Sequence, residues 1–189
     1  ADFLGSSNTL VSTEKLQELS FKDPLFSRDS LDVYEEPIPN SSYVMTVDVA
    51  RGQGIDFSAF SVFDTTEIPY KVVAKYKNNH VAPLHFPNII NIVGKRYNNA
   101  YILVEINDIG SQVADVLHHD LEYEFLYSTS WYGRHGQQLS GGVKKDSSFG
   151  VRTTRAMKKL GCSNLKSLLE EDKLLIPDYD MISELTTFV

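Results

Sequence analysis

The sequence predicts an α/β domain with a mixed central β-sheet flanked by helices. Three stretches with the composition of strands, 43–50, 58–64 and 70–76, follow one another with no helix between them, so part of the sheet is antiparallel. A segment with helical periodicity, 83–97, then leads to a fourth apolar strand, 101–106. At 189 residues and 42 % hydrophobic content, the chain is long enough for one domain with a sizeable core.

The first strand, 43–50, is an apolar, β-branched run with one acid, Asp48, near its end. A polar loop with Gly52 and Gly54 follows and leads to a second acid, Asp56. An acid at the carboxyl end of a buried strand faces the crevice in which open α/β sheets bind ligands. The alternative is that Asp48 only hydrogen-bonds the turn after it.

The next two strands extend the sheet from the first. The stretch 58–64 alternates well enough to pair back onto the first strand as a hairpin, and 70–76 follows a turn at Pro69. The helix expected over 83–97 has apolar residues at three- and four-residue spacing, which are Phe86, Ile89, Ile90 and Val93.

The fourth strand, 101–106, is almost purely apolar but includes Glu105. A buried glutamate is rare unless it is paired or binds a metal, because desolvating a lone carboxylate is costly. Two acids on two hydrophobic strands suggest carboxylates that converge on a cation. Ligation by oxygen alone suits Mg²⁺ or Mn²⁺, and the usual partner of such an ion is a substrate phosphate.

After Glu105 we expect Asp108 to cap a helix over 111–118, and a short strand over 124–127. Residues 128–149 are rich in glycine and polar residues and show no periodicity, which predicts a long, mobile loop. Two helices, 152–160 and 164–171, are expected to be separated at Gly161; a short strand over 174–176 and a helical turn over 179–185 complete the chain.

Residues 1–40 are predicted to be a lead-in, and the domain is predicted to span residues 41–189. Ser12 is suited to cap a short helix over 13–20, after which Pro24, Pro37 and Pro39 punctuate an acidic tether. A linker at this end of the domain implies that another domain precedes it.

The net charge of −7 argues against nucleic-acid binding, but the basic residues are concentrated in one segment. Between Gly133 and Leu160 there are seven basic residues and one acid, Asp146, a local charge of +6 (7 − 1). Such a strip is suited to a DNA backbone, for which we expect Lys144, Lys145, Arg152, Arg155 and Lys158 to bind phosphates. The alternative is a solvated loop followed by an ordinary charged helix face.

Two further features limit the function classes. The single cysteine, Cys162, excludes a disulfide framework and a cysteine-rich zinc site, and favours a reducing, intracellular setting. No apolar run is long enough to span a bilayer, so we expect no membrane partner.

Several segments resemble one known family. VDVARGQGIDFSAF at 47–60 and YILVEINDIGSQVADVL at 101–117 resemble the C-terminal nuclease domain of the large terminase subunit, the DNA-packaging motor of tailed, myovirus-type bacteriophages. GVKKDSSFGVRTTRAMKKLG at 142–161 is similar to the family's basic segment, and ISELTTFV at 182–189 to the stretch before its last acidic strand. The opening FLGSSNTLV is similar to the end of the family's ATPase domain.

The resemblance implies a ribonuclease-H-like fold and a metal-dependent endonuclease that cleaves concatemeric double-stranded viral DNA during packaging. Two divalent ions are expected, with Asp48 bridging them, Glu105 completing one coordination shell and Asp56 as an auxiliary ligand or a turn-stabilising residue. The family's third essential acid lies on a later strand, which we expect beyond Val189. Asp178 and Asp180 do not match its context.

The resemblance also implies the partners and the location. These are double-stranded DNA, an N-terminal ATPase domain, the phage portal and the small terminase subunit, in the host cytoplasm and transiently at the procapsid portal. Two other functions stay open: a non-catalytic docking module of the packaging motor, and an actin-like ATPase, against which Arg51 and Asp56 count because phosphate-cradling loops are rich in Gly, Ser and Thr.

Overall fold

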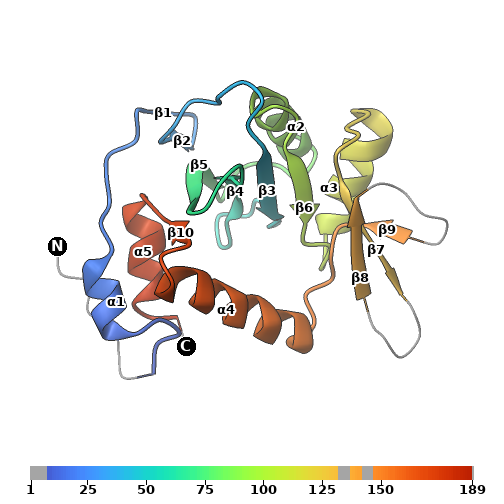
Figure 1. The fold of residues 1–189 in the computed structure, drawn as a ribbon. Coiled ribbons are helices and arrows are strands. Elements are labelled where there is room, and N and C mark those ends of the chain that lie inside the picture. Colours follow the sequence, from blue (N-terminus) through green and yellow to red (C-terminus); the bar gives the residue numbers. More distant parts are fainter. Residues whose placement is uncertain (1–7, 132–136, 142–146, 189) are drawn as a thin grey trace.

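The computed structural model describes residues 8–131, 137–141 and 147–188 of the chain. Its centre is a seven-stranded sheet with the hydrogen-bonded order β1-β2-β5-β4-β3-β6, in which β10 also pairs with β5 (Figure 1). The strands are β1 Phe26–Arg28, β2 Leu31–Val33, β3 Tyr43–Asp48, β4 Ser58–Asp64, β5 Tyr70–Asn78, β6 Tyr101–Val104 and β10 Leu174–Leu175.

The sheet is mixed, as predicted. Strands β3, β4 and β5 form an antiparallel meander, while β6 runs parallel to β3, and β10 runs parallel to β5. The crossover from β5 to β6 is made by the helix α2, Phe86–Arg96. Both acid-bearing strands therefore lie side by side and end at the same edge of the sheet.

One face of the sheet packs against α2, α3 (Gly110–Asp115) and the π-helical turn η1 (Val116–Asp120). In β3, the alternate residues Tyr43, Met45 and Val47 are buried in this core, so the side chains between them point to the opposite face. Helix α2 contributes Phe86 and Ile90 to the same core, which confirms the helix that the spacing predicted.

The opposite face is covered at the β5 and β10 end of the sheet. There α1 (Thr13–Glu18), α5 (Tyr179–Leu185) and the second half of α4 (Arg155–Glu170) share a second apolar cluster with Val72 of β5. Thr46 of β3, on the same face, stays exposed. Figure 1 shows α4 running from the small sheet that contains β9 to α5 and α1.

The prediction of a loop over residues 128–149 is wrong. The described part of this segment forms a three-stranded antiparallel sheet, in the order β8-β7-β9, from β7 Tyr127–Trp131, β8 Gln137–Gly141 and β9 Ser147–Phe149. Its buried side chains include Ser128, Thr129 and Ser130, which are small and polar. Strands are predicted from the alternation of apolar and polar residues, and these strands lack it. The sequence pattern therefore could not indicate them.

The predicted break at Gly161 is also wrong, because α4 is continuous from Arg155 to Glu170. A glycine inside a helix costs about 1 kcal/mol relative to alanine, which tertiary packing and capping can offset. The Thr154 side chain caps this helix by accepting a hydrogen bond from the Met157 amide.

The interpretation of residues 1–40 as a tether is wrong for their described part. The segment carries α1, capped by Ser12 as predicted, and β1 and β2, which extend the sheet through the pairing of β2 with β5. Leu16 and Val33 are fully buried. The segment therefore contributes Leu16 and Val33 to the two apolar clusters of the domain. None of the helices in the described part of the chain combines the length and apolar content of a membrane span.

Candidate functional site

Asp48 and Glu105 occupy neighbouring positions on β3 and just after β6. The parallel register pairs Val47 with Val104, and the Glu105 amide donates a 2.8 Å hydrogen bond to the Val47 carbonyl. Continuing the register by one residue places Asp48 beside Glu105, on the face opposite the buried Val47 and Val104. The structure thus brings together the two acids that the sequence singled out.

The surroundings of Asp48 make its carboxyl harder to ionise. Desolvation by the surrounding protein, the charge of Glu105 and a hydrogen bond shared with it raise the pKa of Asp48 above its usual value, and the charge of Asp56 adds to this. A hydrogen bond from the Val49 amide opposes the rise in pKa, and is the only sign of the turn-stabilising alternative for Asp48. A cation bound beside Asp48 would favour its ionised form and so oppose this rise in pKa.

Glu105 is held in place by its neighbours. Its Oε1 accepts a 2.8 Å hydrogen bond from the Asn107 side chain, and its backbone forms a bridge with Val151. Gly110, at the start of α3, lies so close that a Cβ there would be 1.8 Å from the Glu105 carbonyl oxygen. A glycine at this position is therefore what lets α3 pack against the Glu105 backbone.

Asp56 lies on the glycine loop after β3, and its charge acts on Asp48. Both line a hollow of about 430 Å³. Gly52 has a positive φ of 68°, and a Cβ there would lie 2.4 Å from the Val81 carbonyl oxygen, so only glycine fits this turn. The Ala50 amide donates to the Ser58 hydroxyl at 3.0 Å, which closes the base of the loop.

Asp108 does not cap α3, contrary to prediction. The N-cap of that helix is Ile109, without a side-chain hydrogen bond. Asp108 instead accepts hydrogen bonds from Arg51 Nε at 2.9 Å and Arg51 Nη2 at 2.7 Å, and this pairing lowers the pKa of Asp108. The backbone at Asp108 has a positive φ of 50°, which turns its side chain towards the glycine loop rather than the helix.

These groups fit a divalent cation. Asp48 and Glu105 offer oxygen ligands from rigid strand ends, and Asp56 lies close enough to act on Asp48 electrostatically. Within residues 8–131, 137–141 and 147–188, no three His, Cys, Asp or Glu side chains already form a closed ligand cluster. The pair of acids would therefore need further oxygen atoms, from water or a phosphate, to complete a metal shell.

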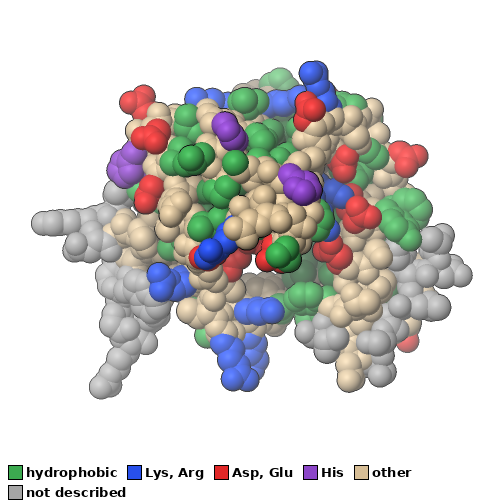
Figure 2. Space-filling view, turned by 180° about the vertical axis from the view of Figure 1, so that it is seen from behind, with side chains coloured by type: hydrophobic (Ala, Val, Ile, Leu, Met, Phe, Trp, Pro, Cys, Tyr) green, Lys and Arg blue, Asp and Glu red, His purple; other side chains and the backbone are tan. Residues whose placement is uncertain are grey.

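Asp48 borders two more hollows on the uncovered face of the sheet. One, of about 260 Å³, is lined by Thr46, Ser61, Leu103 and Glu105, and the other, of about 270 Å³, extends along β4 and β5 towards α5. Figure 2 shows an opening in the middle of this view, with acidic side chains directly above it and Lys and Arg side chains below it.

The predicted phosphate-binding residues are resolved only in part. Lys144 and Lys145 lie outside the described residues. Arg152, Arg155 and Lys158 are exposed, the first just after β9 and the others in the first half of α4. This stretch of chain directly follows Val151, which forms an isolated backbone bridge with Glu105.

Sequence reasoning missed the cations near the site. Arg51 and two lysines of β5, Lys75 and Lys77, line hollows that also contain Asp48. The signal for the lysines was available, because their two-residue spacing in a strand puts both on one face. Asp178 and Asp180, which were not assigned to the site, both pair with Lys75.

Comparisons with known proteins agree with the fold. The family model of the terminase RNaseH-like domain matches residues 45–189. The large terminase nuclease of the thermophilic phage G20c with bound magnesium is similar in structure, with a TM-score of 0.72 and 18 % identity over 96 % of this chain and 80 % of that one. The same nuclease with bound cobalt gives a TM-score of 0.70 at 19 % identity, with the same coverage of both chains. The large terminase nuclease domain of Thermus phage P74-26 gives 0.66 at 18 % identity, over 95 % of this chain and 77 % of that one.

Proposed function

The chain belongs to the terminase RNaseH-like domain family, and from this premise we propose that it is a divalent-metal-dependent endonuclease that cleaves concatemeric double-stranded viral DNA during genome packaging. The observation that carries the proposal is the juxtaposition of Asp48 and Glu105 on parallel strands, which raises the pKa of Asp48. Family membership favours this activity over the actin-like ATPase.

The proposed chemistry is hydrolysis of a phosphodiester bond. Two ions, Mg²⁺ or Mn²⁺, would stabilise the charge on the attacking and leaving oxygens and lower the pKa of a bound water. Similar terminase nucleases have been crystallised with magnesium, cobalt and zinc, which supports a divalent ion. Asp48 would bind both ions from the end of β3, Glu105 would bind one of them, and Asp56 would serve as an auxiliary ligand.

The chain's own residues would do two things around these ions. Asn107 orients the Glu105 carboxylate through its hydrogen bond to Oε1. Arg152, Arg155 and Lys158, together with Lys144 and Lys145, would bind DNA phosphates, and contacts of this kind position a duplex without reading its sequence.

The biological setting belongs to the same proposal. The domain would act together with an N-terminal ATPase domain, the portal and the small terminase subunit, in the host cytoplasm and transiently at the procapsid. The family to which the chain belongs supports this setting.

Plasmid cleavage with Mg²⁺ or Mn²⁺ tests the activity. We would compare the chain, a C-terminally extended chain, and the extended chain with Asp48→Asn. The expected loss for Asp48→Asn exceeds the roughly 100-fold that removal of a residue supporting a metal ligand costs. Asp115→Asn, which changes an exposed carboxylate on α3, is the matched control.

Each outcome has a definite meaning. Cleavage by the extended chain that disappears with Asp48→Asn and persists with Asp115→Asn would establish the nuclease. Cleavage indifferent to Asp48→Asn would place the active site elsewhere. If no version cleaves, the docking-module alternative takes the place of the nuclease.

A further inference from the structure

Lys77 of β5 lies in the same row across the sheet as Asp48. The register pairs Asp48 with Ala59 of β4, and Ala59 with Lys77. Paired residues have their side chains on one face, so Asp48 and Lys77 point the same way and their strands lie about 10 Å apart, two strand spacings. Ala59, between them, contributes only a methyl group, and all three residues line the same hollow of about 270 Å³.

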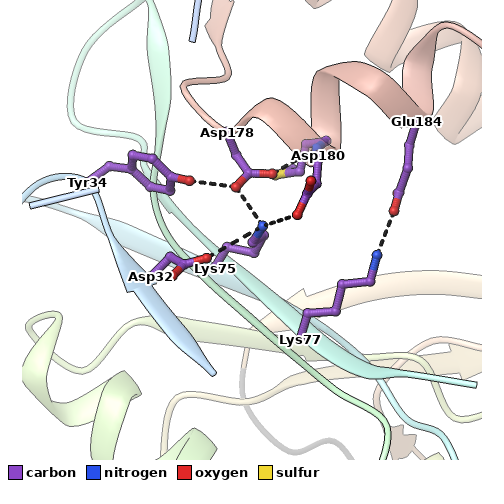
Figure 3. A network of polar contacts seen from close by, with 8 residues as sticks. Asp32, Tyr34, Lys75, Lys77, Asp178, Asp180 and Glu184 are labelled. Carbon is purple, nitrogen blue, oxygen red and sulfur yellow. Dashed lines mark hydrogen bonds and ion pairs between the residues drawn. The ribbon is translucent and has the colours of Figure 1, made fainter. Parts of the chain in front are cut away.

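Two contacts hold the Lys77 ammonium at present. Nζ lies 2.7 Å from Glu184 Oε1 of α5, as Figure 3 shows, and 4.8 Å from the centre of the Phe57 ring. Phe57 directly follows Asp56, so its ring places the ammonium beside the acidic loop. The Glu184 side chain is 68 % exposed, and an ion pair open to solvent is weak and exchanges readily.

Lys75 provides the contrast, two residues earlier on the same face. Its Nζ lies 2.6 Å from Asp178, 3.4 Å from Asp180 and 3.6 Å from Asp32, and it is almost fully buried (Figure 3). Asp178 also accepts a hydrogen bond from the Tyr34 hydroxyl and one from the Met181 amide. Lys75 therefore holds α5 against the sheet through buried ion pairs, whereas Lys77 contacts α5 through one solvent-exposed ion pair.

A DNA backbone that approached the proposed metal centre would meet several carboxylates, and a cation at the position of Lys77 would reduce the repulsion. Asp48, Glu105, Asp56 and Glu184 surround the hollows near the proposed metal centre and would repel a DNA backbone. Arg152, Arg155 and Lys158, the described part of the predicted basic strip, line none of these hollows. A lysine ammonium is a point charge on a flexible stem, and so it can leave one anion for another.

We propose that Lys77 binds a phosphate of the DNA strand next to the scissile bond, and that Lys77 stays ion-paired with Glu184 until a DNA phosphate replaces this carboxylate. This rests on the proposed nuclease function for the placement of the scissile bond. DNA binding then exchanges a carboxylate partner for a phosphate partner at the same ammonium. Glu184 is a positioning residue in this scheme, because it acts on DNA only through Lys77.

The test measures binding of a fluorescent 20-base-pair duplex by anisotropy, at several salt concentrations, with Ca²⁺ in place of Mg²⁺. The variants are Lys77→Ala, Glu184→Gln and the double variant. The matched control is Lys71→Ala, which changes a partly exposed, ion-paired lysine at the other end of β5. Melting temperatures should stay within about 4 °C of the unmodified chain, since only exposed ion pairs are lost.

Lys77→Ala should weaken binding about tenfold and reduce the slope of log K against log salt by about 0.9, the value for one phosphate contact. Glu184→Gln should strengthen binding about threefold, and this gain should vanish in the double variant. The proposal fails if Lys77→Ala behaves like Lys71→Ala, if the Glu184→Gln gain persists without Lys77, or if the chain does not bind the duplex.

These outcomes separate the inference from the nuclease proposal. Binding that depends on Lys77, in a chain whose extended form does not cleave, would overturn the nuclease but keep the phosphate site. Cleavage that depends on Asp48, with a Lys77→Ala variant identical to the Lys71→Ala control, would keep the nuclease and overturn the phosphate site.

Discussion

Arg51 and Asp108 form an ion pair with two hydrogen bonds, which ties the loop after β3 to the turn after β6. The two residues are 57 positions apart in the chain and both are exposed. The pair connects the segments that carry Asp56 and Glu105, and Arg51 and Asp108 line the same hollow as Asp48 and Asp56. It therefore links the glycine loop to the segment that carries the second acid.

Removing this pair should loosen the loop without unfolding the domain. Arg51→Ala is expected to weaken Mn²⁺ binding by less than about fivefold, as suits an exposed ion pair. Arg51→Lys should recover only part of the loss, because an ammonium cannot make the two parallel hydrogen bonds of a guanidinium. Calorimetric titration with Mn²⁺ measures both. Equal affinity in all three proteins would show that the pair does not position the loop.

Metal binding should stabilise the chain in a pH-dependent way. The pKa of Asp48 is raised in the folded chain, so ionisation of Asp48 opposes folding. The contribution of Asp48 to stability is fully present below about pH 3.8, the ordinary pKa of an aspartate. This contribution is lost as the pH rises through the raised pKa of the folded chain. A cation removes this penalty, and at a concentration of 100 times its Kd it should add about 2.7 kcal/mol at neutral pH. Thermal unfolding from pH 4 to about 8, with and without Mg²⁺, measures the effect. The stabilisation by Mg²⁺ should decrease towards acid pH and should be absent in Asp48→Asn.

The buried Lys75 should matter far more for stability than Lys77. Lys75→Met leaves the Asp178 carboxylate buried without its cation, which should cost about 3–5 kcal/mol. Lys77→Ala, which breaks an exposed pair, should cost less than about 1 kcal/mol. Urea unfolding distinguishes the two. Similar losses for both variants would mean that α5 is not fastened through Lys75.

The same network predicts acid sensitivity. Burial would raise the pKa of Asp178, but hydrogen bonds from Lys75 and Tyr34 outweigh it and hold the pKa below its usual range. Asp178 therefore adds stability above about pH 3.8, and this is lost as the pH falls through its lowered value. In Asp178→Asn this part of the acid transition should disappear from a pH titration of unfolding free energy. If the unfolding free energy of Asp178→Asn fell at acid pH just as in the unmodified chain, Asp178 would not be the source of this part of the transition.

The exposed basic residues should bind DNA through charge alone. Replacing Arg152, Arg155 and Lys158 by alanine should reduce the salt slope of duplex binding by about 0.9 per residue, equally for different DNA sequences. Lys22→Ala, which changes an exposed lysine away from this stretch, is the control. A loss that depended on the DNA sequence would indicate base contacts instead.

Gly161 should be replaceable within α4. It is exposed, and a Cβ there would meet nothing within 4 Å, so Gly161→Ala should stabilise the chain by about 0.5–1 kcal/mol. Gly110→Ala is the opposite case, since its Cβ would collide with the Glu105 carbonyl. Chemical unfolding of both variants checks the contrast. Destabilisation by Gly161→Ala would show that α4 needs the glycine.

Local patterns were enough to predict the central part of the fold and the acid pair. The strands with Asp48 and Glu105 were predicted from short apolar runs, the hairpin of β3 and β4 from alternation, and helix α2 from apolar residues at three- and four-residue spacing. Each of these signals lies within one short window of sequence. The resemblance of the two acidic segments to terminase nucleases agrees with the family match. Charge counting located the basic strip, of which the structure describes Arg152, Arg155 and Lys158 as exposed.

Tertiary structure decided what depends on partners far away in the chain. The three-stranded sheet from β7 to β9 is made by backbone pairing between segments in which most residues are polar. Strand β2 belongs to the main sheet because it pairs with β5, about 40 residues later in the chain. The row from Asp48 through Ala59 to Lys77 exists only once two strand registers are set. Lys75 and Asp178 meet across 103 positions. Sequence windows record periodicity along one segment, whereas register and ion pairing are settled by which segments pack together.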